Sequence, residues 1–98
     1  MDWYKKSKIF TKQEMIDLGA DGHLSSAIKT DIPLSKIVGR EPVPAGNYKK
    51  GRKVTQPIEV VYDKENDQYI LYSGNHRVHQ AEINGDLTVP AFVEMEKS

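Results

Sequence analysis

The residues best suited to chemistry are four consecutive ones in the second half of the chain, glycine, asparagine, histidine and arginine at positions 74–77, which follow the apolar run Tyr69–Tyr72. The pattern predicts a buried strand, a tight turn and a helix over 75–84 that ends at Gly85. A helix that begins directly after a strand presents unpaired backbone N–H groups and a partial positive charge. The stretch therefore predicts a phosphate-binding turn.

The side chains of this turn add donors to those of the backbone. An arginine guanidinium matches two phosphate oxygens at once, and histidine is the side chain able to act as an acid or base near neutral pH. His76 is accordingly the candidate catalytic group, and no second catalytic group is identifiable. The candidate phosphate ligands are the four residues of the turn and the next histidine along the helix: Gly74, Asn75, His76, Arg77 and His79.

A second group of basic residues stands in the stretch 39–53, which contains two prolines and three glycines and is predicted to be a long loop. Three interpretations remain open. The loop is a solvated surface run, or it folds over phosphates bound at Gly74, or it lies on a nucleic-acid backbone through salt-sensitive contacts. Its basic members are Arg40, Lys49, Lys50, Arg52 and Lys53.

No metal site is predicted. His76 and His79 share a helical face but lack a third placed ligand. The acidic turn 63–67 resembles the start of a calcium loop, yet it lacks the glycine of the sixth position and the glutamate of the twelfth. The chain contains no cysteine, which excludes disulfides, thiolate ligands and cysteine nucleophiles.

The bulk composition predicts one domain with one modest core, because the chain has 98 residues. Fourteen basic and fourteen acidic residues cancel, so only a local patch could attract nucleic acid. A mean hydropathy of −0.61 and the lack of an apolar run near ~20 residues predict no membrane span. The first residues show no signal-peptide pattern, and a cytoplasmic location is expected.

The remaining elements follow from local patterns. A capping box at Thr11 and Glu14 predicts a short helix. Polar residues 63–67 predict the turn of a hairpin. We expect an N-terminal helical extension over residues 1–30 and one compact domain over 31–98. The expected elements are a helix over Lys12–Leu18, a helical turn within His23–Lys29, an edge strand over Asp31–Val38, and strands over Gln56–Tyr62, Gln68–Tyr72 and Thr88–Glu94.

Three stretches carry a family likeness: IPLSKIV near Ile32, QPIEVVYD from Gln56, and YSGNHRVHQA followed by INGDLTVPAFV. The run from Ile32 to Val93 resembles the domain shared by the N-terminal part of chromosome-partitioning ParB proteins and by sulfiredoxin. The resemblance implies an α+β fold, with a small mixed β-sheet and a helix that follows the GNHR turn.

In ParB proteins the corresponding turn reads GERRxRA, and it holds the triphosphate of a bound nucleotide. By position Gly74 matches the glycine, Asn75 the glutamate, His76 and Arg77 the two arginines, and His79 the later arginine. In sulfiredoxin the turn reads GCHR, which places Asn75 on the catalytic cysteine and His76 and Arg77 on its phosphate-contacting pair. The resemblance implies a nucleoside triphosphate, accompanied by Mg, as the ligand.

This chain also departs from both families. Without a cysteine, reduction of a sulfinic acid by the sulfiredoxin mechanism is excluded. Asn75 replaces the ParB glutamate, and an amide oxygen is a weaker ligand for a hard cation than a carboxylate, which argues against metal-assisted hydrolysis. The loop over 39–55 stands where the family carries a helix. Specific centromere binding is not expected, because helix-turn-helix and dimerisation regions do not follow.

The leading functional hypothesis is therefore a domain that binds a nucleotide or another phosphate group. Weak hydrolysis of that nucleotide, or of a nucleic-acid phosphodiester as in a nuclease, would be a further step, and whether the protein is an enzyme is left open. The alternative is a non-catalytic DNA-binding or protein-interaction accessory protein of a plasmid or phage. In a DNA-binding protein the basic loop would contact the DNA. In a protein-interaction module the fold would bind a protein partner in place of nucleotide or DNA.

Overall fold

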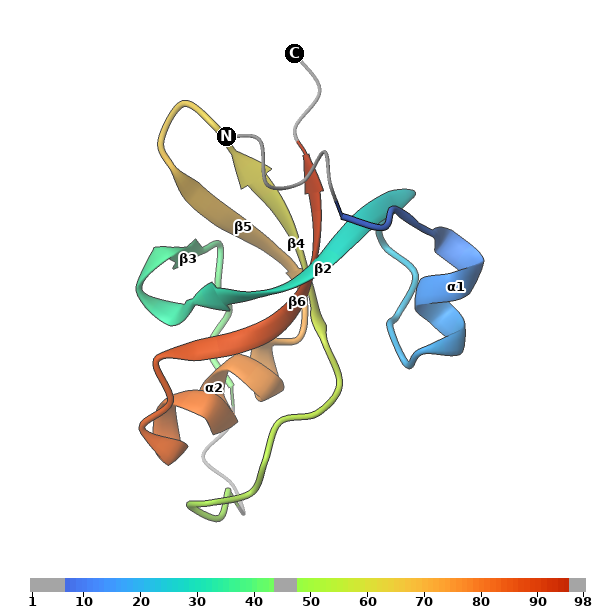
Figure 1. Ribbon diagram of the computed structural model, residues 1–98. Coiled ribbons are helices and arrows are strands. Elements are labelled where there is room, and N and C mark those ends of the chain that lie inside the picture. The colour runs from blue at the N-terminus through green and yellow to red at the C-terminus, as the bar shows by residue number, and fades with distance from the viewer. Residues whose placement is uncertain (1–6, 44–47, 96–98) are drawn as a thin grey trace.

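The computed structural model describes residues 7–43 and 48–95, which form a six-stranded sheet in the order β1-β2-β6-β4-β5-β3 (Figure 1). The pairs β3–β5 and β4–β6 are parallel and the other pairs are antiparallel, so the predicted small mixed sheet is confirmed. The elements are β1 (Phe10–Thr11), α1 (Lys12–Asp17), β2 (Ser26–Pro33), a 3-10 helix η2 (Leu34–Lys36), β3 (Ile37–Val38), β4 (Ile58–Asp63), β5 (Gln68–Ser73), α2 (Asn75–Asn84) and β6 (Thr88–Met95).

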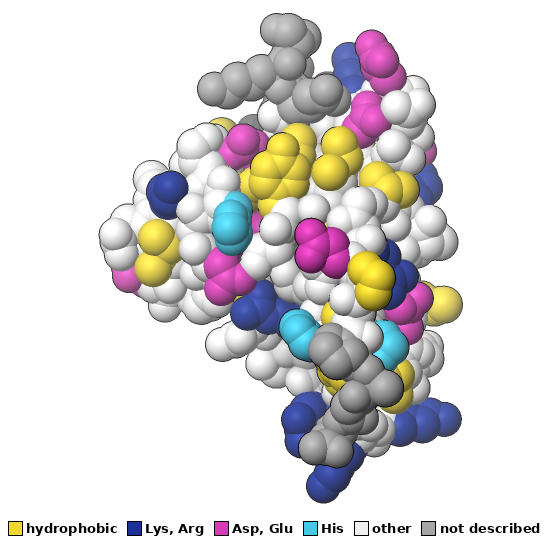
Figure 2. Space-filling view, turned by 180° about the vertical axis from the view of Figure 1, so that it is seen from behind, with side chains coloured by type: hydrophobic (Ala, Val, Ile, Leu, Met, Phe, Trp, Pro, Cys, Tyr) yellow, Lys and Arg dark blue, Asp and Glu magenta, His cyan; other side chains and the backbone are white. Residues whose placement is uncertain are grey.

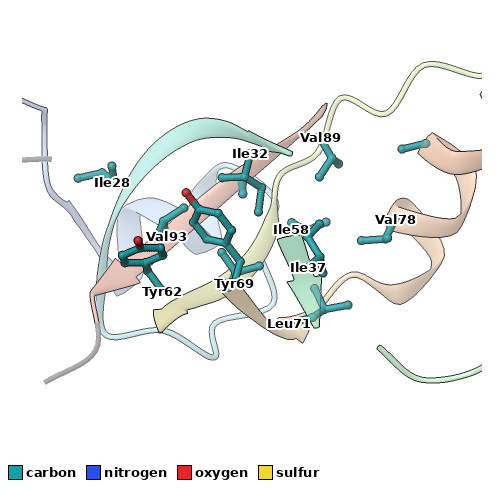
Figure 3. Close-up of a cluster of buried hydrophobic side chains, with 13 residues drawn as sticks. Ile28, Ile32, Ile37, Ile58, Tyr62, Tyr69, Leu71, Val78, Val89 and Val93 are labelled. Atoms are coloured by element: carbon teal, nitrogen blue, oxygen red, sulfur yellow. The ribbon is translucent and has the colours of Figure 1, made fainter. Parts of the chain in front are cut away.

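The sheet has a separate apolar cluster on each face, because neighbouring residues of a strand point to opposite sides. On one face, alternate residues of β4 and β6 pack with Val78 and Ala81 of α2 (Figure 3). On the other face, Phe92 packs with Met15 of α1 and with Leu24. The sheet therefore lies between α2 and the α1 segment. No helix in the described part of the chain is long and apolar enough to cross a membrane.

Helix α1 confirms the first predicted helix and its cap. The Thr11 Oγ1 accepts the Glu14 N–H at 3.2 Å, and the Glu14 carboxylate accepts the Thr11 N–H at 3.0 Å. The helical turn predicted within His23–Lys29 is wrong, because Ser26–Pro33 form β2 and pair with β6. Pairing with a complete neighbouring strand outweighs the weak helical spacing of a short apolar run.

The edge strand predicted over Asp31–Val38 is correct only in part. Strand β2 lies inside the sheet between β1 and β6, and it ends at Pro33, which has no N–H to donate. The chain then turns through η2, where the Leu34 N–H donates to the Leu87 carbonyl at 3.1 Å, and forms β3 at the opposite edge. The predicted boundary between an N-terminal extension, 1–30, and a domain, 31–98, falls inside β2. That boundary stays a prediction.

The predicted hairpin of β4 and β5 is confirmed, and its acidic turn is held by donors of the protein. The Tyr62 hydroxyl donates to one oxygen of the Asp67 carboxylate at 2.6 Å, and the Lys36 ammonium donates to the other at 2.6 Å. Asp63 accepts the backbone N–H of Glu65 at 3.1 Å. The carboxylates of the turn thus stabilise the hairpin.

These contacts predict that the stability of the folded protein depends on pH at both ends of the scale. The hydrogen bond to Asp67, with burial, raises the pKa of Tyr62 from about 10 to about 12, so the stabilisation from neutral Tyr62 is complete below pH 10 and is lost as the pH rises towards 12. The Lys36 and Tyr62 hydrogen bonds lower the pKa of Asp67, so its stabilisation is lost as the pH falls through 3.8 and below. In a spectrophotometric titration of the five tyrosines, we expect Asp67→Asn to bring the phenolate of Tyr62 back towards pH 10.

Glu65→Gln is the matched control, because the exposed Glu65 uses its backbone N–H and not its carboxylate in this turn. It should leave the titration unchanged. Because burial also raises the pKa of Tyr69, the quantity compared is the difference between the curves of the unmodified protein and Asp67→Asn. A titration curve that does not change in Asp67→Asn would contradict the assignment.

Candidate functional site

The connection between β5 and α2 consists of Gly74 alone, which caps the helix in a left-handed conformation with φ 116°. A Cβ atom at this position would lie 2.6 Å from Cγ2 of the buried Ile58, so the position requires glycine. Among residues 7–43 and 48–95, no side chain makes a capping hydrogen bond at the start of α2. The N–H groups of its first turn therefore lack an acceptor from the described residues, and the predicted strand, turn and helix are confirmed.

A pocket of about 420 Å³ opens beside the N-terminus of α2. All four residues at positions 74–77 line it, as the sequence predicts for a common site. The rest of its wall comes from the end of β5, from the loop segment 41–43 and from Asp21. The pocket therefore combines the donors of the helix N-terminus with the carboxylates of Asp21 and Glu41.

Arg77 is held at the edge of the pocket by the segment that precedes β4. Its guanidinium donates to the Pro57 carbonyl at 3.2 Å and to the Gln56 side-chain oxygen at 3.2 Å. These bonds use part of the five-donor fork and fix its direction. Arg77 is half-buried, so the remaining donors are preorganised.

Asn75 and Arg40 both hold the loop segment that forms one wall of the pocket. The Asn75 side-chain oxygen accepts the Glu41 N–H at 2.7 Å. The Arg40 guanidinium donates to both carboxylate oxygens of Glu82 on α2, one of them at 2.9 Å. This hydrogen-bonded pair lowers the pKa of Glu82 and raises that of Arg40. Arg40 is thus paired with α2 and does not line the pocket.

Tyr48 packs between the two histidines of α2. Its hydroxyl makes a hydrogen bond with Nδ1 of His76, the two rings stack at 6.1 Å, and the ring of His79 meets it edge-on at 4.6 Å. His76 lines the pocket, whereas His79 does not. Within residues 7–43 and 48–95, no three histidine, aspartate or glutamate side chains are placed to hold a metal by themselves.

Asp21 reaches the pocket because its loop is fixed by a buried carboxylate. Glu59 of β4 is fully buried, and its Oε1 accepts the N–H groups of Asp21 at 2.7 Å and Gly22 at 2.9 Å. Its Oε2 accepts those of His23 at 2.7 Å and Leu24 at 3.0 Å. The Asp21 carboxylate in turn accepts a hydrogen bond from the Ser73 hydroxyl.

The basic residues of the long loop lie elsewhere. Side chains of Gln80 and Asn84 hold the backbone of residues 49–52 against the second half of α2. Neither Lys49 nor Arg52 lines the pocket, and among the described loop residues those that line it are 41–43. Residues 44–47 of the predicted loop lie outside the described residues.

Among solved structures, the chain is similar to the C-terminally truncated chromosome-partitioning protein ParB from Caulobacter crescentus, which was crystallised in complex with CTP-gamma-S. The fold is ParB-like. The TM-score is 0.51 with 22% identity, over 71% of this chain and 46% of that one, so the chain spans less than half of its neighbour. No protein-family model matches the chain, and no curated protein matches its sequence significantly.

Sequence reasoning predicted the residues of the turn in this ParB-like domain, but it missed those that arrive from other segments. Asp21, Glu41 and Tyr48 carry no local signal, because each is brought to α2 by contacts distant in sequence. Glu59 did carry a signal, since it is a single charged residue inside the apolar strand that begins at Ile58. A charge in a buried strand requires donors from elsewhere.

Proposed function

We propose that this domain binds a nucleotide, or another ligand with a phosphate group, in the pocket at the N-terminus of α2. The observation that carries the proposal is the uncapped first turn of this ten-residue helix, which lines a pocket together with Arg77 and His76. Backbone N–H groups at a helix N-terminus bind anions, and a guanidinium adds paired donors. The nucleotide analogue in the ParB neighbour supports a nucleotide as the ligand.

The pocket fits a nucleotide best when a divalent cation accompanies it. Asp21 and Glu41 line the same pocket, and two carboxylates would repel a bare triphosphate. Mg²⁺ is bound in proteins by one or two carboxylates together with substrate phosphates, and these two residues would serve as those ligands. The cation would supply neutralisation of the phosphate charge, while Arg77 and the helix N-terminus orient the phosphate.

Tyr72 offers a surface for the base of the nucleotide. It lines the pocket, and 53% of its surface is exposed although it is a large aromatic residue. Bases stack on aromatic faces irrespective of their identity, so Tyr72 would add affinity without selecting among nucleotides. Its place on the pocket wall beside the start of α2 supports this role.

Hydrolysis would be a further activity of the same site, with His76 as its acid or base. The Tyr48 hydroxyl contacts Nδ1 of His76 and orients the ring, which leaves Nε2 for a water or a leaving oxygen. In that case His76→Gln should lower turnover by a larger factor than it lowers nucleotide affinity. Phosphate release measured alongside binding separates the two properties.

Thermal unfolding tests the proposal. A panel of CTP, ATP and GTP, with and without Mg²⁺, is expected to raise Tm by about 6–11 °C for the preferred nucleotide at ten times its Kd. Arg77→Ala should remove most of this rise, because it deletes the paired donors at the pocket edge. The quantity compared is the rise for each variant, since Arg77→Ala also loses the bonds to Gln56 and Pro57.

Lys64→Gln is the control variant, because Lys64 is exposed in the β4–β5 turn and lies outside the pocket. Its nucleotide-dependent rise should equal that of the unmodified protein. The proposal fails if no nucleotide raises Tm under either condition, or if the rise is unchanged in Arg77→Ala.

A further inference from the structure

The turn of residues 49–53, which we call the basic turn, is the densest positive surface of the described chain. Its charged side chains are all basic and exposed: Lys49, Lys50, Arg52 and Lys53. No ion pair among residues 7–43 and 48–95 includes any of them. Because the whole chain has a net charge of zero, this surface is a local concentration of charge.

Helix α2 holds the backbone of the basic turn in one conformation. The amide of the buried Gln80 donates to the Lys49 carbonyl at 2.8 Å. One helical turn later, the Asn84 side chain accepts the Gly51 N–H at 2.7 Å and donates to the Arg52 carbonyl at 2.7 Å. The Gln80 amide also donates to the Asn84 oxygen at 2.9 Å, which fixes the orientation of both side chains.

This arrangement differs from a solvated charge run, which needs no fixed backbone. The polar backbone groups at residues 49, 51 and 52 bond inward to α2, and the exposed part of the turn consists of its side chains. Figure 2 shows basic side chains gathered at the lower end of one face of the molecule. A segment whose backbone is already ordered loses less backbone conformational entropy when it binds.

We propose that the basic turn binds the phosphate backbone of a nucleic-acid duplex. A duplex carries about one negative charge per 1.7 Å of its axis, which suits four neighbouring cations. Residues 49–53 contain no aromatic side chain for the stacking that single strands require, and the neighbouring Tyr48 contacts the rings of His76 and His79. The contacts are therefore with phosphates and are independent of base sequence.

The basic turn is separate from the nucleotide pocket. It is held by residues 80 and 84 of α2, whereas the pocket is formed at residues 74–77, and the whole helix is about 15 Å long. The proposed duplex contacts thus use no residue of the proposed nucleotide site, and Arg77→Ala should retain most of the duplex affinity. A loss of duplex binding in Arg77→Ala would contradict this separation.

The test is fluorescence anisotropy with a short labelled DNA duplex of arbitrary sequence, between about 50 and 200 mM salt. The triple variant Lys49→Gln/Lys50→Gln/Lys53→Gln is expected to bind at least about tenfold more weakly at the low salt. Its slope of log K against log salt should fall by up to about 2.7, because each lost phosphate contact contributes about 0.9. The affinity reports the contacts that are lost, and the salt slope reports the number of phosphate charges that are no longer neutralised.

A matched control has the same charge change at three exposed lysines of other elements, Lys12→Gln/Lys29→Gln/Lys64→Gln. It should retain most of the affinity and the slope. Asn84→Ala changes no charge but removes two bonds to the turn, so it should weaken binding several-fold with the slope preserved. The proposal is overturned by an absence of duplex binding at low salt, by equal losses in the two triple variants, or by binding to phosphatidylserine vesicles and not to the duplex.

Discussion

Glu59→Gln is expected to lower the free energy of unfolding by about 3 kcal/mol, which corresponds to a fall in Tm of about 12–24 °C for a domain of this size. Each carboxylate oxygen of Glu59 accepts two backbone N–H groups, and the side chain is fully buried. Glutamine keeps only one acceptor oxygen. Its NH₂ group would face two N–H donors, so a substitution that preserves shape would still leave the loop unsatisfied.

The same substitution is expected to affect the pocket, because the donors belong to the loop that carries Asp21. When this loop is released, Asp21 no longer has a fixed position beside the helix N-terminus. Glu59→Gln should therefore lower the nucleotide affinity measured with Mg²⁺ by a larger factor than the affinity measured without Mg²⁺. Isothermal titration at a temperature where the variant is folded measures both affinities.

Glu65→Gln serves as the control for Glu59→Gln, because it makes the same chemical change at an exposed position of the β4–β5 turn. Its stability should change by less than about 0.5 kcal/mol. A urea-unfolding experiment that places Glu59→Gln equally close to the unmodified protein would show that the four hydrogen bonds contribute little.

The parts of the fold that were predicted correctly depend on residues close together in the sequence. The capping box of Thr11 and Glu14 is complete within four positions, and it fixes the start of α1. Gly85 ends α2 in a left-handed conformation, with φ 76°, for reasons confined to its own backbone. The β4–β5 hairpin closes across the polar turn between Asp63 and Gln68. Such signals are readable without knowledge of the rest of the chain.

Strand β2 could not be predicted in this way, because its partner is the last strand. Ala27 and Ile28 are adjacent and both buried, since they pack in clusters on opposite faces of the sheet. A strand covered on both faces shows no alternation of apolar and polar residues. Leu24, Ala27 and Ile28 have the spacing of one face of a helix. The segment is a strand because it pairs with β6, where Ile28 lies opposite Val93.

The candidate site also has one part that is predictable from local sequence and one part that is not. The half proposed to bind phosphate is contiguous, residues 74–77, and the chemistry of a helix N-terminus is readable from the residues themselves. Its acidic half is supplied by Asp21 and Glu41, which reach the pocket through the side chains of Glu59 and Asn75. By the resemblance Asn75 replaces the glutamate of the ParB turn, whereas in the structure its side-chain oxygen accepts the Glu41 N–H and holds the segment that brings Glu41 to the pocket.

Gly74→Ala is the second substitution with a large expected effect, a loss of about 3 kcal/mol of stability. A left-handed conformation costs about 1–2 kcal/mol for a residue with a side chain, and overpacking of a core adds about 1–3 kcal/mol. Both costs apply, because Gly74 has φ 116° and the new Cβ would lie 2.6 Å from Cγ2 and 2.9 Å from Cβ of Ile58. Ile58 is fully buried and cannot move aside freely.

Gly85→Ala isolates the backbone cost from the steric one, since Gly85 has φ 76° but no atom within 4 Å of an added Cβ. It should lose only about 1 kcal/mol. The difference between the two variants in urea unfolding therefore measures the contact between the turn and β4. If Gly74→Ala is no less stable than Gly85→Ala, then β4 does not support the start of α2. The position of the first-turn N–H groups would in that case depend on α2 alone. The contact with Ile58 would then not fix the donors to which phosphate binding is assigned in the proposal.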